Sequence, residues 1–107
     1  MPPVVTEYDD ALDDAAQEWL RVRIWIERGQ VTRFMVQYET TLAGQRVPVV
    51  RYDTAHGFVH RDQMFRHRRT VKVELDPTLS FAGVVEIAER DIRQNWQQYR
   101  HDFEVQP

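Results

Sequence analysis

The sequence predicts an α+β fold, in which an antiparallel meander sheet of four to five strands carries one long C-terminal helix on one face. Two patterns of apolar residues predict this fold. Over residues 18–76 apolar and polar side chains alternate at every second position, which is typical of half-buried strands. After Asp76-Pro77 the apolar residues recur every third or fourth position, as on a helix. A chain of 107 residues fits one domain, residues 1–107.

Short turn signals separate the alternating runs. Gly29-Gln30, Ala43-Gly44-Gln45 and Gly57 each follow one run and precede the next. Connections this short join antiparallel neighbours, so consecutive runs are expected to pair as hairpins. The expected strands are the runs WLRVRIWIER, VTRFMVQYETTL, VPVVRYD, FVHRD and TVKVELD.

The helix is expected over residues 78–103, with the hydroxyl of Thr78 or Ser80 as its N-cap. Its apolar stripe consists of Phe81, Val84, Val85, Ala88, Ile92, Trp96, Tyr99 and Phe103. A single helix can cover only one face of a sheet. The other face is therefore open, covered by the N-terminal segment, or paired with a second subunit.

Charge is unevenly distributed along the chain, although the net charge is only -3. Residues 1–17 contain five carboxylates and no Lys or Arg, and we expect them to form an acidic arm or a short helix. Residues 61–72 are basic, so the arm folds over or near them, or else an external partner does. The negative net charge argues against an indiscriminate polyanion binder.

Composition excludes several classes of protein. The chain has no cysteine, which excludes disulfides, thiolate metal sites and a catalytic cysteine. It has no apolar run of about 18 residues, so no membrane span is expected. The first ten residues lack a secretory signal. Four scattered glycines form no phosphate-binding loop. These features predict a cytoplasmic protein.

The uncovered sheet face is unusual because tryptophans stand among arginines on it. Trp19, Arg21, Arg23 and Trp25 share one side of the first run, and Met35 lies on the same side of the second. Such a face is typical of a ligand-binding surface or a subunit contact. We therefore expect a homodimer or a ligand on this face.

The stretch RYDTAHGFVHRD concentrates polar chemistry in one hairpin. If its loop has an even number of residues, Arg51 and Asp53 share a face with Phe58, His60 and Asp62. Tyr52, Val50 and Val59 then point to the core, and His56 sits at the loop tip. An odd loop or a bulge would break this alignment.

One interpretation of this hairpin is phosphodiester cleavage without a metal. His60 and His56 are the acid–base candidates, and Asp53 is the orienting carboxylate. Arg51 and Arg61 are the phosphate ligands. The competing interpretation is a structural network, in which Asp53 pairs with Arg51 and His60 pairs with Asp62.

Two further interpretations use the same region. A metal held by His56, His60, Asp53 and Asp62 is disfavoured because Gly57 interrupts the spacing of the histidines, so no metal or cofactor is expected. A nucleic-acid surface would combine Arg66, Arg68 and Arg69 with the Trp/Arg face. The alternative is that these basic residues protect an edge strand from pairing.

The segment Arg51-Tyr52-Asp53, followed by His56 and His60, resembles small prokaryotic TumE-like toxins of toxin–antitoxin loci. The turn is short here, and Arg61-Asp62 stands where further His or Lys is expected. The resemblance implies a small accessory protein that acts on RNA or its translation, with an antitoxin as a protein partner. The competing expectation is a non-catalytic interaction or oligomerisation module that uses the Trp/Arg face.

Overall fold

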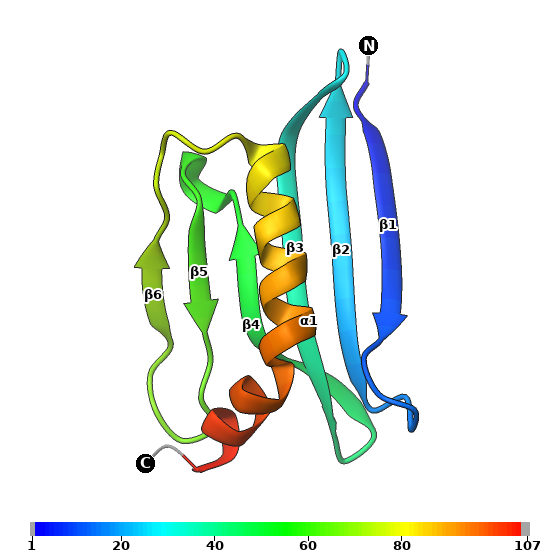
Figure 1. Ribbon diagram of the computed structural model, residues 1–107, viewed down its shortest axis with the longest axis vertical. Helices are drawn as coiled ribbons and strands as arrows, with labels where there is room; N and C mark the ends of the chain where they lie inside the picture. The colour runs from blue at the N-terminus through cyan, green and yellow to red at the C-terminus, as the bar shows by residue number, and fades with distance from the viewer. Residues whose placement is uncertain (1, 106–107) are drawn as a thin grey trace.

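The computed structural model describes residues 2–105, except for the side chain of His56. It shows a six-stranded antiparallel sheet with strand order β1-β2-β3-β4-β5-β6, crossed on one face by helix α1 (Figure 1). The α+β class and the C-terminal helix are confirmed, but the sheet has six strands rather than four to five. The elements are β1 (Val4–Ala11), β2 (Glu18–Glu27), β3 (Gln30–Leu42), β4 (Gln45–Asp53), the 3₁₀ turn η1 (Ala55–Gly57), β5 (His60–Gln63), β6 (Val71–Glu74) and α1 (Phe81–Val105).

The additional strand is β1, which lies where an acidic arm or a short helix was expected. It pairs with β2 along its whole length, from Val4 opposite Ile26 to Ala11 opposite Trp19. The sequence did not predict it because most of its side chains are exposed on both faces, so it shows no apolar alternation. Its acidic residues lie beside β2, at the sheet edge opposite the basic residues 61–72 (Figure 1).

Two tight turns set the hairpins that flank β3. Arg28 and Gly29 both have positive φ (51° and 73°), as do Ala43 and Gly44 (50° and 78°). Two successive positive φ values are typical of the two-residue turns that match the twist of antiparallel strands. The first turn is therefore Arg28-Gly29, one residue earlier than expected.

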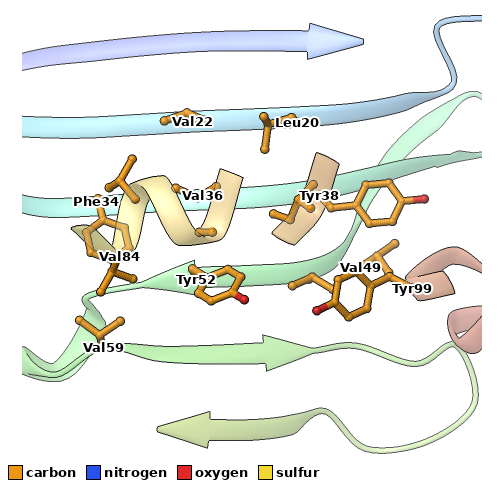
Figure 2. Packing of buried hydrophobic residues seen from close by; sticks show 14 of the residues in the cluster. Leu20, Val22, Phe34, Val36, Tyr38, Val49, Tyr52, Val59, Val84 and Tyr99 are labelled. Atoms are coloured by element: carbon orange, nitrogen blue, oxygen red, sulfur yellow. The ribbon is translucent and has the colours of Figure 1, made fainter. Parts of the chain in front are cut away.

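The core lies between α1 and the three middle strands β2, β3 and β4 (Figure 2). The sheet side chains at alternate positions of these strands are fully buried, and the helix stripe packs onto them. Burial of this apolar surface is the main term that holds the helix to the sheet. The buried cluster contains Leu20, Val22, Phe34, Val36, Tyr38, Val49, Val50, Tyr52, Val59, Val84, Val85, Ala88, Ile92, Tyr99 and Phe103.

Buried polar contacts fix the helix position. The Asp91 carboxylate accepts hydrogen bonds from the hydroxyls of Tyr52 (2.6 Å) and Tyr99 (2.7 Å). Burial, followed by the bond to Asp91, raises the pKa of both tyrosines. Further along the sheet, buried Glu18 accepts from the hydroxyls of Tyr38 and Thr40. The Glu18 contacts join β2 to β3, and the Arg100 guanidinium of α1 lies 3.8 Å from the same carboxylate. Because a buried hydroxyl without a partner is costly, the Tyr52–Asp91 contact between β4 and α1 favours one position of the helix over others.

Ser80 is the N-cap of α1, one of the two residues expected in that role. Its hydroxyl accepts a hydrogen bond from the Gly83 N–H at 3.0 Å, and its carbonyl accepts from the Val84 N–H at 3.0 Å. The helix extends to Val105, two residues beyond the expected end. Within residues 2–105, no helix combines the length and apolarity needed to cross a membrane.

The Asp91 contact generates a stability prediction. Replacing Asp91 by Ala leaves two largely buried tyrosine hydroxyls without their acceptor, so we expect the free energy of unfolding to fall by about 2–4 kcal/mol. Asp91→Asn retains one acceptor oxygen and should lose less. Urea unfolding followed by circular dichroism measures both changes. Equal stability of the wild type and Asp91→Ala would show that the tyrosine contacts do not hold the helix.

Candidate ligand-binding face of the sheet

The hairpin of β4 and β5 has the register expected for an even loop. Asp53 lies opposite His60, and Arg51 lies opposite Asp62, with residues 54–59 forming the loop. All four side chains are therefore on the face away from α1, whereas Tyr52 and Val59 are in the core. The backbone of His56 lies in η1, but its side chain is outside the described residues, so its expected role cannot be placed.

His60 is held between two carboxylates but is not at the surface. Its Nε2 lies 3.2 Å from Asp53 Oδ1 and 3.7 Å from Asp62 Oδ2. The residue is only 2% exposed, and the ring of Phe58 lies 5.8 Å from its ring. Asp53 thus meets the histidine rather than Arg51. The histidine–carboxylate pair exists, but the imidazole is shielded from a large ligand.

Polar atoms without hydrogen-bond partners concentrate on β5. Among the described residues, the buried side-chain atoms without one are His60 Nδ1, Arg61 Nε and Asp62 Oδ1. Asp62 Oδ1 still has the Lys72 ammonium 3.7 Å away, too far for a hydrogen bond but close enough for an ion pair. All the buried side-chain atoms without a hydrogen bond among the described residues therefore lie on β5.

Arg61 is not brought together with Arg51 and His60. It lies on the helix side of β5, where its Nη1 donates to the Tyr99 hydroxyl at 3.4 Å. Successive residues of a strand point to opposite faces, so neighbours in sequence cannot act on the same ligand here. Of the two expected phosphate ligands, only Arg51 lies on the face that carries His60.

The Trp/Arg face surrounds a shallow hollow of about 350 Å³. Four arginines from three neighbouring strands line it: Arg21 and Arg23 from β2, Arg33 from β3, and Arg51 from β4. The other lining residues are Trp25, Phe34, Met35, Gln37, Asp53 and Ala55. Three of the residues predicted for this face, Arg21, Arg23 and Trp25, therefore meet around one hollow.

Trp25 is packed among the guanidinium groups. The Cζ atoms of Arg23 and Arg33 lie 4.7 Å and 4.4 Å from its ring centroid, which is the geometry of a cation–π contact. Arg33 was not among the predicted site residues. Its position was nevertheless readable, because Arg33 has the same alternation as Met35 on the second run.

The positive charge of the hollow is only partly neutralised. Arg23 pairs with Glu7 at 2.7 Å, and Arg21 approaches Glu39 at 3.7 Å. Arg33 and Arg51, by contrast, have no carboxylate within ion-pair distance among the described residues. Two guanidinium groups at one hollow thus lack a counter-ion within the described part of the chain.

A buried amide holds one of these groups in place. Gln37 is 5% exposed, and its Oε1 accepts a hydrogen bond from Arg51 Nε at 2.5 Å. Its Nε2 donates to Glu39 at 2.5 Å, and Glu39 in turn accepts from Arg46 Nε at 2.8 Å. This chain of contacts orients Arg51 without neutralising it.

The predicted basic residues of the β5–β6 connection do not join this face. Arg66 pairs with Glu104, and its N–H donates to the Phe103 carbonyl, so it lies at the C-terminal end of α1. The Cζ atom of Arg68 lies over the Phe65 ring at 4.6 Å. Trp25 lies near the β2–β3 turn, at the other end of the sheet (Figure 1). Arg66, Arg68 and Arg69 are therefore separate from the Trp/Arg hollow.

Within the described residues, no group of three or more His, Asp or Glu side chains has an arrangement that could hold a metal ion. Asp53, His60 and Asp62 are close together but already interact with one another and with Lys72. The metal interpretation also required His56, whose side chain is not described.

The fold and the hollow define a small α+β protein with one covered and one open sheet face. A family model described as "Domain of unknown function (DUF7718)" matches residues 4–106, and the chain belongs to this family. No curated protein and no solved structure matches the chain.

The burial of His60 generates a second stability prediction. Replacing His60 by Ala removes a ring that fills space between two carboxylates, and we expect the free energy of unfolding to fall by about 2–4 kcal/mol. His101→Ala removes an exposed histidine of α1 and is the matched control, expected to have little effect. Thermal and urea unfolding measure both. Equal stability of the two variants would contradict a structural role for His60.

Proposed function

We propose that the protein is a non-catalytic binding module whose open sheet face binds a short segment of single-stranded RNA. The observation that carries the proposal is the hollow beside Trp25, in which Arg33 and Arg51 have no carboxylate partner among the residues that the structure describes. A phosphate supplies the missing counter-charge, and a guanidinium group binds it through paired hydrogen bonds.

The arrangement of Arg51 supports phosphate binding. Its Nε–H donates a hydrogen bond to Gln37 Oε1, which fixes the plane of the guanidinium group and leaves both Nη groups for a ligand. A guanidinium that is already oriented loses less conformational entropy when it binds an anion. Arg21, half-exposed on β2, adds a second positive charge within the same hollow.

The tryptophans support recognition of bases. Trp19 and Trp25 both lie on this face of β2, six positions apart, which is about 20 Å along a strand. Single-stranded RNA is commonly bound by aromatic side chains on a sheet, on which unstacked bases pack. Arginine planes stack on bases too, so the Arg–Trp25 contacts extend the stacking surface.

The flanking acidic residues favour a short ligand over a long polyanion. Glu7 and Asp9 border the arginines on β1, and Asp62 and Glu74 border them on β5 and β6. A duplex that crossed the whole sheet would meet these carboxylates, and like charges repel it. The basic strip over β2, β3 and β4 accommodates only a few nucleotides.

Binding can be tested with a fluorescein-labelled eight-nucleotide single-stranded RNA and fluorescence anisotropy. We expect Arg33→Ala and Arg51→Ala each to raise Kd about tenfold, and Trp25→Ala to raise it at least as much. Arg90→Ala, which removes an exposed arginine of α1, is the charge-matched control. The slope of log Kd against log salt should flatten in the two hollow variants but not in the control. Identical binding by all the arginine variants would contradict the proposal.

RNA cleavage by a toxin-like activity is a second candidate, supported by the His60–Asp53 contact at 3.2 Å. The 2% exposure of His60 weighs against it, because a base catalyst must reach the ribose hydroxyl. In this proposal an antitoxin protein would be the partner.

The two candidates differ in their response to expression in a bacterial host. The binding proposal predicts normal growth and intact total RNA for the wild type and His60→Asn alike. Growth arrest with RNA loss in the wild type, relieved by His60→Asn while Arg90→Ala remains toxic, would instead identify a ribonuclease.

A further inference from the structure

We propose that β6 is a homodimer interface, at which two copies of the chain pair their β6 strands antiparallel and form one continuous sheet. β6 is a terminal strand, and all four of its residues are exposed. Val71 and Val73 are 38% and 42% exposed even though they lie on the helix side of the sheet. Helix α1 lies over the middle strands and leaves this flank uncovered (Figure 1).

The backbone of β6 determines which residues can pair with a second strand. The Leu75 N–H donates to the Val59 carbonyl at 3.1 Å, and Val73 lies opposite Arg61. In an antiparallel pair the inward- and outward-facing residues alternate, so Val71, Val73 and Leu75 turn their backbone groups toward β5. Lys72 and Glu74 therefore turn theirs toward the free edge.

Charge then favours one of the two-fold registers centred on Lys72, Val73 or Glu74. A pair centred on Lys72 places two lysines opposite each other, and a pair centred on Glu74 places two glutamates opposite each other. A pair centred on Val73 places Lys72 of each copy opposite Glu74 of the other, and these are the residues with outward-facing backbone groups. Opposite charges that face each other across strands stabilise the pairing, and like charges oppose it.

The same register also buries the exposed apolar residues. On the helix side, Val73 meets its own copy, and Val71 meets Leu75 of the second chain. Leu75, Leu79 and Phe81, together with Glu74 and Asp76, line a hollow of about 160 Å³ beside the C-terminal end of β6. Burial of this surface contributes to association in addition to the backbone hydrogen bonds.

The opposite edge of the sheet lacks this self-complementarity. β1 carries Glu7, Asp9 and Asp10 and has no basic residue, so its self-pairing brings carboxylates together. Acidic residues on an edge strand are a common protection against such pairing. Lys72 alone would protect β6 from self-pairing in the same way. In the register centred on Val73, however, Glu74 of the second copy neutralises its charge.

Sedimentation equilibrium on charge-reversal variants of the full chain tests the proposal. We expect a wild-type dimer and, for Lys72→Glu and Glu74→Lys separately, a dimer Kd about tenfold or more higher. Each variant alone places like charges opposite each other. An equimolar mixture of the two variants restores opposite charges in every pair, so it should form a heterodimer. The double variant Lys72→Glu/Glu74→Lys should dimerise as the wild type does.

Arg90→Glu on the exposed surface of α1 carries the same charge change as Lys72→Glu and is expected to leave the dimer unchanged. Circular dichroism of each variant shows that it is folded. A monomeric wild type would overturn the proposal. So would a dimer that is indifferent to both single variants, or variants that fail to associate when mixed. None of these outcomes depends on RNA binding.

Discussion

The packing of one helix on the middle of a six-stranded sheet is the constraint on which the other features depend. Helix α1 buries the inner faces of β2, β3 and β4. Asp91 of the helix accepts a hydrogen bond from Tyr52 of β4, and Arg100 of the helix lies 3.8 Å from Glu18 of β2. A helix is about 10 Å wide and the sheet strands are about 4.8 Å apart, so it cannot cover the outer strands. It reaches β1 only through polar side chains, from Glu89 to Tyr8 and from Arg93 to Asp10. The open face and both edges remain available for other contacts.

The alternation of side chains along each strand divides the chemistry between the two faces. His60 and Asp62 face away from the helix with Arg51, whereas Arg61 between them joins the tyrosines under α1. The same rule gathers the arginines of β2, β3 and β4 around Trp25. The position of a residue in its strand therefore decides whether its charge lies under the helix or on the open face.

Much of this fold was predictable because its longer strands alternate apolar and polar residues, and its helix repeats apolar residues every three or four positions. β2 to β5 and the register of Arg51, Asp53, His60 and Asp62 follow from alternation and loop parity. The strand β1 was missed because its stability comes from pairing with β2 and from contacts such as Tyr8 to Glu89, which no local pattern reveals. The face of Arg33 could be read from its alternation with Met35, but the burial of His60 depends on how β5 packs against its neighbours and on the Phe58 ring, which no local pattern reveals.

The unsatisfied atoms of β5 have a consequence for local stability. His60 Nδ1, Arg61 Nε and Asp62 Oδ1 lose hydration on folding without gaining a hydrogen bond, whereas the strands under α1 are well satisfied. Regions of this kind open before the rest of a domain. We therefore expect the amide protons of β5 and β6 to exchange with solvent through partial opening of the β5–β6 hairpin. The amide protons of β2 and β3 should exchange only when the whole domain unfolds.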